Sequence, residues 1–157
     1  MARLMARSNL ARDASARPLG IRSDVELTAQ QVSALARLEA YDLTPVRERL
    51  LREGSMPADW VDEALRELRR YLALKAVLAD DVPGMLSLQV DEAWHACLLF
   101  TRLYADLCDQ CFGTFVHHEP DTEEHLDPVG RWEAFEELYR AWFGELGRVW
   151  RVHQPIP

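Results

Sequence analysis

The chain has 157 residues, of which 48% are apolar, so it is long enough to bury the core of one domain and too apolar to be disordered. Its acidic net charge of −8 argues against nucleic acid as the main partner, and we expect another protein instead. No run of residues is long and apolar enough for a transmembrane helix. Three cysteines without framework spacing fit a reducing compartment, so we expect a cytoplasmic protein.

The first predicted segment, residues 1–24, is a basic tail without hydrophobic periodicity. Residues 1–22 hold five arginines against one aspartate, a charge of +4 that leaves −12 for the remainder of the chain. We predict that this tail is disordered and that residues 25–157 form a single helical domain. Contact of the tail with phosphate or with an anionic lipid surface is the alternative interpretation.

Three amphipathic helices are predicted before the centre of the chain, which is rich in Leu, Ala, Arg and Glu. The first spans residues 28–41 with a threonine cap, and the second spans 44–54 with Thr44 as its cap and a proline next to it. The third and longest spans 58–79. Residues 80–88 contain Pro and Gly and are predicted to form an ordered loop.

A central helix is predicted over residues 89–111, and Gly113 ends it. Residues 114–130 follow as a long loop rich in His and in acids, and the last helix spans 132–143 with an extended tail after it. The fold class that we predict is all-α, a compact orthogonal bundle of about four main helices. The central helix is expected to lie between the third helix and the last one.

Two faces of the central helix carry different chemistry. Asp91 and His95 are four residues apart, so a carboxylate and an imidazole meet on one face. The cysteines lie on the opposite face, and without a second Cys-x-x-Cys pair they are predicted to pack in the core. Glu92 and His95 also spell the Glu-x-x-His of di-iron proteins, but no second copy of that motif is present in the sequence.

Two further histidines, His117 and His118, follow the central helix. If the chain folds back along the helix, one of them reaches Asp91 or His95 and completes a set of two imidazoles and one carboxylate, which suits Zn, Fe or Cu. Alternatively, His95 bonds to Asp91 and the histidine pair only holds the loop in place. The sequence contains no phosphate-binding loop, nucleophile elbow or HExxH motif.

The segment DEAWHACLLFTRLYADLCDQCFGTFVHHEP resembles the glycine-rich-domain-protein-like (GRDP-like) family of uncharacterised proteins, in its small bacterial stand-alone form. Its pattern is matched by Asp91, Trp94, His95, Tyr104, Cys108, Phe112, Gly113, His117 and His118. Many members of that family carry a second histidine where this chain has Cys97, and the helical wheel directs this position away from His95. The resemblance implies a helical domain with a polar cluster and a structural role for Trp94, Tyr104, Cys108, Phe112 and Gly113.

Two functional hypotheses remain open, and the sequence identifies no reaction. The first is a protein-interaction or scaffold module in which an Asp–His–His polar cluster is structural. The second is a metal-binding protein or metalloenzyme that uses Asp91, His95 and one of the histidines 117 and 118. The two differ in geometry, because a metal requires the three ligand atoms to converge on one point.

Overall fold

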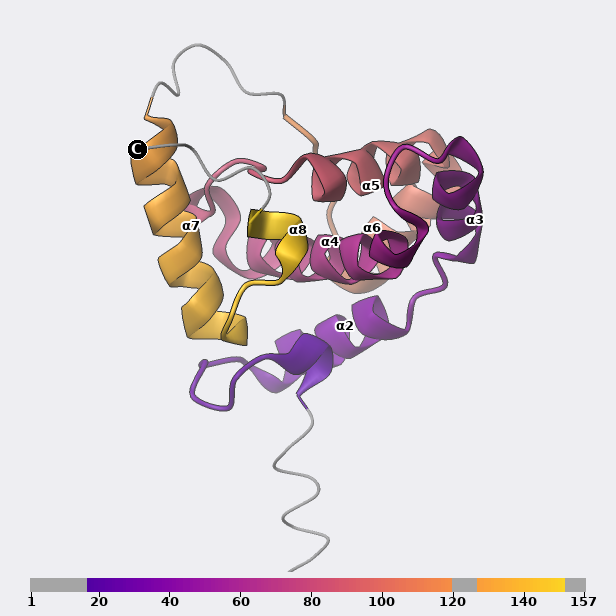
Figure 1. Cartoon of the computed structure of the whole chain (residues 1–157). Coiled ribbons are helices and arrows are strands. Elements are labelled where there is room, and N and C mark those ends of the chain that lie inside the picture. Colours follow the sequence, from indigo (N-terminus) through magenta and orange to yellow (C-terminus); the bar gives the residue numbers. More distant parts are fainter. Residues whose placement is uncertain (1–16, 120–126, 152–157) are drawn as a thin grey trace, which may run out of the picture.

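The structure, a computed structural model, describes residues 17–119 and 127–151, and every regular element in those ranges is helical (Figure 1). The elements are η1 (Pro18–Gly20), α2 (Ala29–Ala40), α3 (Thr44–Glu53), α4 (Ala58–Leu78), η2 (Ala79–Asp81), α5 (Leu88–Leu99), α6 (Thr101–Phe112), α7 (Pro128–Phe143) and α8 (Arg148–Arg151). They pack as a compact bundle, which confirms the predicted all-α class. None of the described helices combines the length and the apolar character that crossing a membrane requires.

The ends of the first helices follow from local sequence. The hydroxyl of Thr28 accepts a hydrogen bond from the backbone N–H of Gln31, and the side chain of Gln31 accepts one from the N–H of Thr28, so a capping box starts α2. Gly54 ends α3 in the left-handed conformation. Thr44 is the first helical residue of α3 and not its cap, and its N–H donates to the carboxylate of Asp42.

The prediction of one central helix is wrong, because the chain breaks at Phe100 into α5 and α6. The N–H of Phe100 still bonds to the carbonyl of Cys97, but its ψ of 69° turns the chain into a new direction. After this break the indole N–H of Trp94 donates to the hydroxyl of Tyr104 at 3.0 Å. Ten residues of straight helix would separate those two positions by about 15 Å. The helical wheel therefore does not hold across the break.

The longest helix, α4, lies at the centre and packs against α2, α3, α5 and α8. Helix α5 packs against α4, as expected, and also against α3, α6 and α8. Helix α7 stands at one edge of the bundle (Figure 1). It joins the core through buried aromatic side chains: Trp132, Phe135, Tyr139 and Trp142.

Both ends of the domain differ from the prediction. Residues 17–24, which we assigned to the tail, are described and packed, and Leu19 and Ile21 are buried in the core. Residues 148–151 form α8 and not an extended tail, and this short helix buries Trp150. The remaining parts of the predicted tails, residues 1–16 and 152–157, lie outside the described residues.

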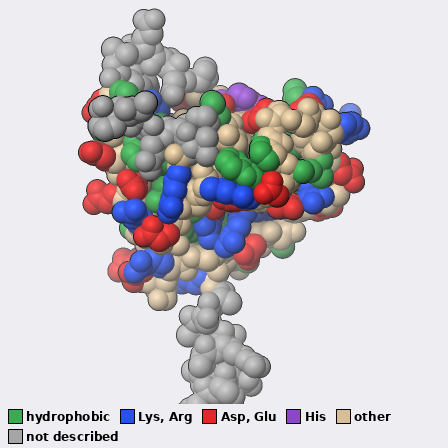
Figure 2. All heavy atoms as spheres, viewed as in Figure 1, with side chains coloured by type: hydrophobic (Ala, Val, Ile, Leu, Met, Phe, Trp, Pro, Cys, Tyr) green, Lys and Arg blue, Asp and Glu red, His purple; other side chains and the backbone are tan. Residues whose placement is uncertain are grey.

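The predicted loop before the last helix is shorter than expected. Helix α7 begins at Pro128, four residues early, because the side chain of Asp127 accepts a hydrogen bond from the N–H of Gly130 and proline suits the first helical position. Residues 120–126 of this loop lie outside the described part. On the face that Figure 2 shows, acidic and basic side chains are interspersed over the helices.

A buried polar network ties four segments together. The guanidinium of Arg70 donates to the carbonyl of Leu19, to Glu67 and to the hydroxyl of Tyr139, at distances of 2.9, 3.1 and 2.6 Å. One carboxylate oxygen of Glu67 accepts hydrogen bonds from the hydroxyl of Tyr139 at 2.7 Å and from the indole of Trp150 at 2.8 Å. Burial raises the pKa of Tyr139. The network joins η1, α4, α7 and α8.

Candidate metal centre

Asp91 and His95 both come from α5, with Asp91 in its first turn. Ser87 caps this helix, since its hydroxyl accepts from the N–H of Val90, and the same hydroxyl donates to the carbonyl of Val149 on α8 at 2.6 Å. This anchor fixes the N-terminal turn of α5, where the helix dipole favours the carboxylate of Asp91. His95 follows one turn later, and its Nδ1 lies 3.7 Å from the carboxylate, too far for a hydrogen bond.

The chain then returns to α5 after α6. Gly113 ends α6 in the left-handed conformation, with φ of +68°, which turns the following residues back. The hydroxyl of Tyr104 donates to the carbonyl of Val116 at 2.5 Å, while it accepts from the indole of Trp94. This chain of two buried hydrogen bonds holds the returning segment against α5.

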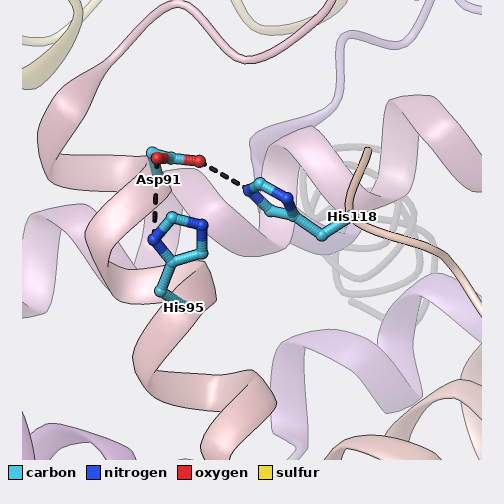
Figure 3. Close-up of side chains that lie close together, drawn as sticks. All are labelled: Asp91, His95 and His118. Atoms are coloured by element: carbon cyan, nitrogen blue, oxygen red, sulfur yellow. Dashed lines mark hydrogen bonds and ion pairs between the residues drawn. The ribbon is translucent and has the colours of Figure 1, made fainter. Parts of the chain in front are cut away.

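His118 lies at the end of that returning segment. Its ring contacts the ring of Trp94 edge-on, with 4.5 Å between centroids. Its Nε2 lies 2.7 Å from a carboxylate oxygen of Asp91, within hydrogen-bond distance. The rings of His95 and His118 are also 4.5 Å apart. Asp91 therefore has an imidazole from each of two separate segments beside its carboxylate (Figure 3).

The three side chains meet the geometric condition for a metal site. Asp91, His95 and His118 each offer a ligand atom, and these atoms all lie within 4.8 Å of one another. Three such atoms share a point within about 2.8 Å of each, close to the 2.0–2.2 Å bonds that Zn²⁺ forms with nitrogen and oxygen. Coordination of an ion at that point would require each ligand atom to move about 0.6–0.8 Å closer to it.

The cluster is open to solvent on one side. The side chain of His118 is 15% exposed, that of Asp91 28% and that of His95 56%. Three protein ligands leave one or more coordination positions for water or for a substrate, as in catalytic zinc sites and in iron sites with two histidines and one carboxylate. An ion held here would act as a Lewis acid and would lower the pKa of a bound water.

The structure distinguishes between the two neighbouring histidines. His117 is exposed and its ring lies against Phe115, with 4.8 Å between centroids, so it takes no part in the cluster. The sequence left this choice open, because either residue can face α5 when the register of an extended segment is unknown. The hydrogen-bonded pair Trp94 and Tyr104, which positions His118, was missed because one straight helix would place these two residues about 15 Å apart along its axis.

The cysteines lie in the core and away from the cluster. Cys97, Cys108 and Cys111 are all buried and free, in agreement with the prediction that they pack in the core. Of the other residues given a structural role, Trp94 and Tyr104 are buried, Phe112 is half-buried, and Gly113 provides the left-handed turn. No cysteine is placed to complete the set of Asp91, His95 and His118 found in the described part of the chain.

The buried thiols give a first prediction. Burial raises the pKa of Cys97 to about 12 and raises the pKa of Cys108 and Cys111 as well. We expect the native protein to react slowly with a thiol reagent at about pH 8, and the unfolded protein to expose three fast thiols. A time course of thiol titration checks this, and one fast thiol in the native protein would contradict it.

The same raised pKa values predict how stability depends on pH. Above about pH 9 the thiols of the unfolded protein lose their protons while those of the folded protein keep them, so the free energy of unfolding should fall as the pH rises further.

Fold and site together define a small all-α domain that carries an Asp–His–His cluster beside the first turns of one helix. The chain belongs to the UCP032817-like family, whose family model matches residues 35–142. That match contains all three residues of the cluster and most of the helices around it. No curated protein and no solved structure matches this chain. The matching family carries no GRDP designation, so the resemblance to the GRDP-like family stays a prediction.

Proposed function

We propose that this protein binds one divalent transition-metal ion through Asp91, His95 and His118. The observation that carries the proposal is the convergence of the three ligand atoms within 4.8 Å, although they come from segments more than twenty residues apart. Two imidazole nitrogens and one carboxylate oxygen suit Zn²⁺ or Fe²⁺, and Cu²⁺ is a third ion that this set of ligands can bind.

The surroundings of the cluster support the proposal. The two hydrogen bonds through Tyr104 hold the segment that delivers His118, and Ser87 holds the turn that delivers Asp91. Such supporting contacts orient ligands before an ion arrives. Because His95 is more than half exposed, the bound ion would keep a position open to small molecules. A role in metal-dependent chemistry follows more readily from this arrangement than a closed structural site.

The alternative is a structural polar cluster in a protein-interaction module. The 2.7 Å contact between Asp91 and His118 supports it, because that hydrogen bond satisfies the carboxylate and holds residues 113–118 without any ion. In that case the cluster contributes to stability only. The alternative and the metal site predict different results for the same set of variants.

The test is the metal content of the purified, tag-free protein after incubation with Zn²⁺ or, without oxygen, with Fe²⁺ and then exhaustive dialysis. We expect about one equivalent in the wild type and at least a tenfold lower affinity in His118→Ala and in His95→Ala. His117→Ala is the matched control, because it removes the neighbouring imidazole that faces away, and it should keep the metal.

The His95→Ala variant is expected to fold, because His95 is exposed and makes only a 3.7 Å contact with Asp91. Its metal content therefore tests the proposal even if His118→Ala does not fold. Thermal unfolding of each variant is measured in parallel. No metal in the wild type, together with His118→Ala unfolding at a lower temperature, would support the structural cluster. Equal metal content in the wild type and both ligand variants would place any binding elsewhere.

A further inference from the structure

Helix α5 lies along the upper edge of the bundle in Figure 1, and its solvent-facing side carries a regular stripe of four side chains. Leu88, Glu92, His95 and Leu99 follow one another at spacings of four, three and four residues, so they lie within about 60° of one another around the helix. Among the large apolar side chains in the described part of the chain, Leu88 and Leu99 are the most exposed, at 63% each. The stripe thus has an apolar side chain at each end and two side chains that can bind metal between them.

The spacing of this stripe is the same in both directions along the helix. If two copies of α5 pack antiparallel about a two-fold axis between Glu92 and His95, Leu88 of one copy lies opposite Leu99 of the other. Glu92 of each copy then lies opposite His95 of the other. Apolar side chains therefore meet apolar ones and carboxylates meet imidazoles, so the stripe is complementary to a second copy of itself.

Glu92 is free to make such a contact. No hydrogen bond or ion pair within the described residues uses its carboxylate, and the side chain is partly exposed. The helical wheel places Glu92 on one side of His95 and Asp91 on the other. Glu92 is accordingly not a member of the cluster formed within its own chain.

We propose that the metal-bound protein associates with a second copy through this stripe, and that Glu92 of each copy is the fourth ligand of the other copy's ion. This inference rests on the metal site proposed above, whose three ligands leave a position open. The carboxylate closes that position in the dimer, whereas the monomer keeps it open to small molecules. Association would therefore regulate access to the ion.

The charges explain why the dimer requires the ion. Two-fold packing brings the carboxylates of Asp91 and Glu92 from both copies together, and the net charge of −8 on each chain adds to their repulsion. Two divalent ions supply four positive charges against those four carboxylates. The four leucines of the two stripes bury too little surface for a stable dimer by themselves. We therefore expect a monomer without metal and a dimer with two ions.

The experiment is sedimentation equilibrium of the full, tag-free chain over a range of protein concentrations, in EDTA and with one equivalent of Zn²⁺ per chain. We expect the monomer mass of 18.1 kDa in EDTA and twice that mass with zinc. Glu92→Gln should keep one zinc per chain, because its own three ligands remain, but should dimerise at least tenfold more weakly. Leu99→Gln should also weaken the dimer and keep the zinc.

Two exposed residues outside the stripe provide matched controls. Glu133→Gln on α7 removes an exposed carboxylate, and Leu51→Gln on α3 removes an exposed leucine. Both variants should bind zinc and dimerise as the wild type does.

A mixture of two variants tests the exchange of ligands between copies. In a dimer of one Glu92→Gln chain and one His95→Ala chain, the first chain keeps Asp91, His95 and His118 and receives Glu92 from the second. One complete four-ligand site is thereby restored, although neither variant can form one alone. We expect zinc-dependent dimers in the mixture and in neither variant by itself.

The outcomes separate this inference from the metal site on which it rests. A wild type that binds zinc but stays monomeric overturns the dimer and leaves the proposed metal site intact. A wild type that binds no zinc removes both proposals. The dimer is also overturned if the wild type dimerises equally in EDTA, if Glu92→Gln dimerises as the wild type does, or if the mixture forms no dimers.

Discussion

Replacing Glu67 with alanine is expected to lower the free energy of unfolding by about 3–5 kcal/mol. The change leaves the buried guanidinium of Arg70 without its counter-charge. It also removes the acceptor of the Tyr139 hydroxyl and of the Trp150 indole, both of which are buried. Urea unfolding followed by far-ultraviolet circular dichroism measures the loss.

A surface ion pair provides the control for this prediction. Asp62 pairs with Arg47 at 2.7 Å, but both side chains are well exposed. Asp62→Ala should therefore lower the free energy of unfolding by no more than about 1 kcal/mol. The double variant, with both Glu67 and Arg70 changed to methionine, should lose less free energy of unfolding than the two single changes together. Each single change leaves one buried charge without its partner, whereas the double change removes both charges. If Glu67→Ala costs no more than Asp62→Ala, the network does not hold the four segments together.

Removing the hydroxyl of Tyr104 is expected to affect both stability and metal binding. In Tyr104→Phe the buried carbonyl of Val116 and the buried indole N–H of Trp94 both lose their partner, at a total cost of about 2–4 kcal/mol. Val116 lies two residues before His118, so the released segment should also hold His118 less firmly and weaken metal binding. Urea unfolding and zinc titration measure the two effects.

Tyr41→Phe is the matched control, because the Tyr41 hydroxyl also bonds to two groups, Asp106 and the carbonyl of Leu103, but in a less buried place and to neither Trp94 nor Val116. It should cost about 1 kcal/mol or less and leave zinc binding as in the wild type. If Tyr104→Phe loses stability but binds zinc normally, the position of His118 does not depend on these hydrogen bonds.

Much of the local structure is readable from short stretches of sequence. The Thr28 capping box, the Gly54 end of α3 and the length of α4 all appear where caps, glycine and apolar spacing place them. The pairing of Asp91 with His95 is equally local, because four residues of helix bring two side chains onto one face. In each case the interacting groups lie within about one or two helical turns of each other.

Features that join distant segments are not encoded in this local way. The break at Phe100 has no proline or glycine to mark it, and the apolar pattern continues through it, so packing of α6 on α2 and of α5 on α4 fixes its position. The choice of His118 over His117 depends on hydrogen bonds from Tyr104, beyond the reach of periodicity.

The buried network around Glu67 and the pocket that Lys75 and Trp94 line also depend on contacts between distant segments. In the sequence, Glu67 looks like an ordinary polar residue of an amphipathic helix. In the structure it accepts hydrogen bonds from Tyr139 and Trp150, which lie 72 and 83 residues later in the chain. Lys75 and Trp94 line one cavity because α4 and α5 pack together. Spacing along the chain determines which side chains share one face of a helix. Contacts between helices depend on how all of their apolar faces are buried at once, which no single stretch of sequence specifies.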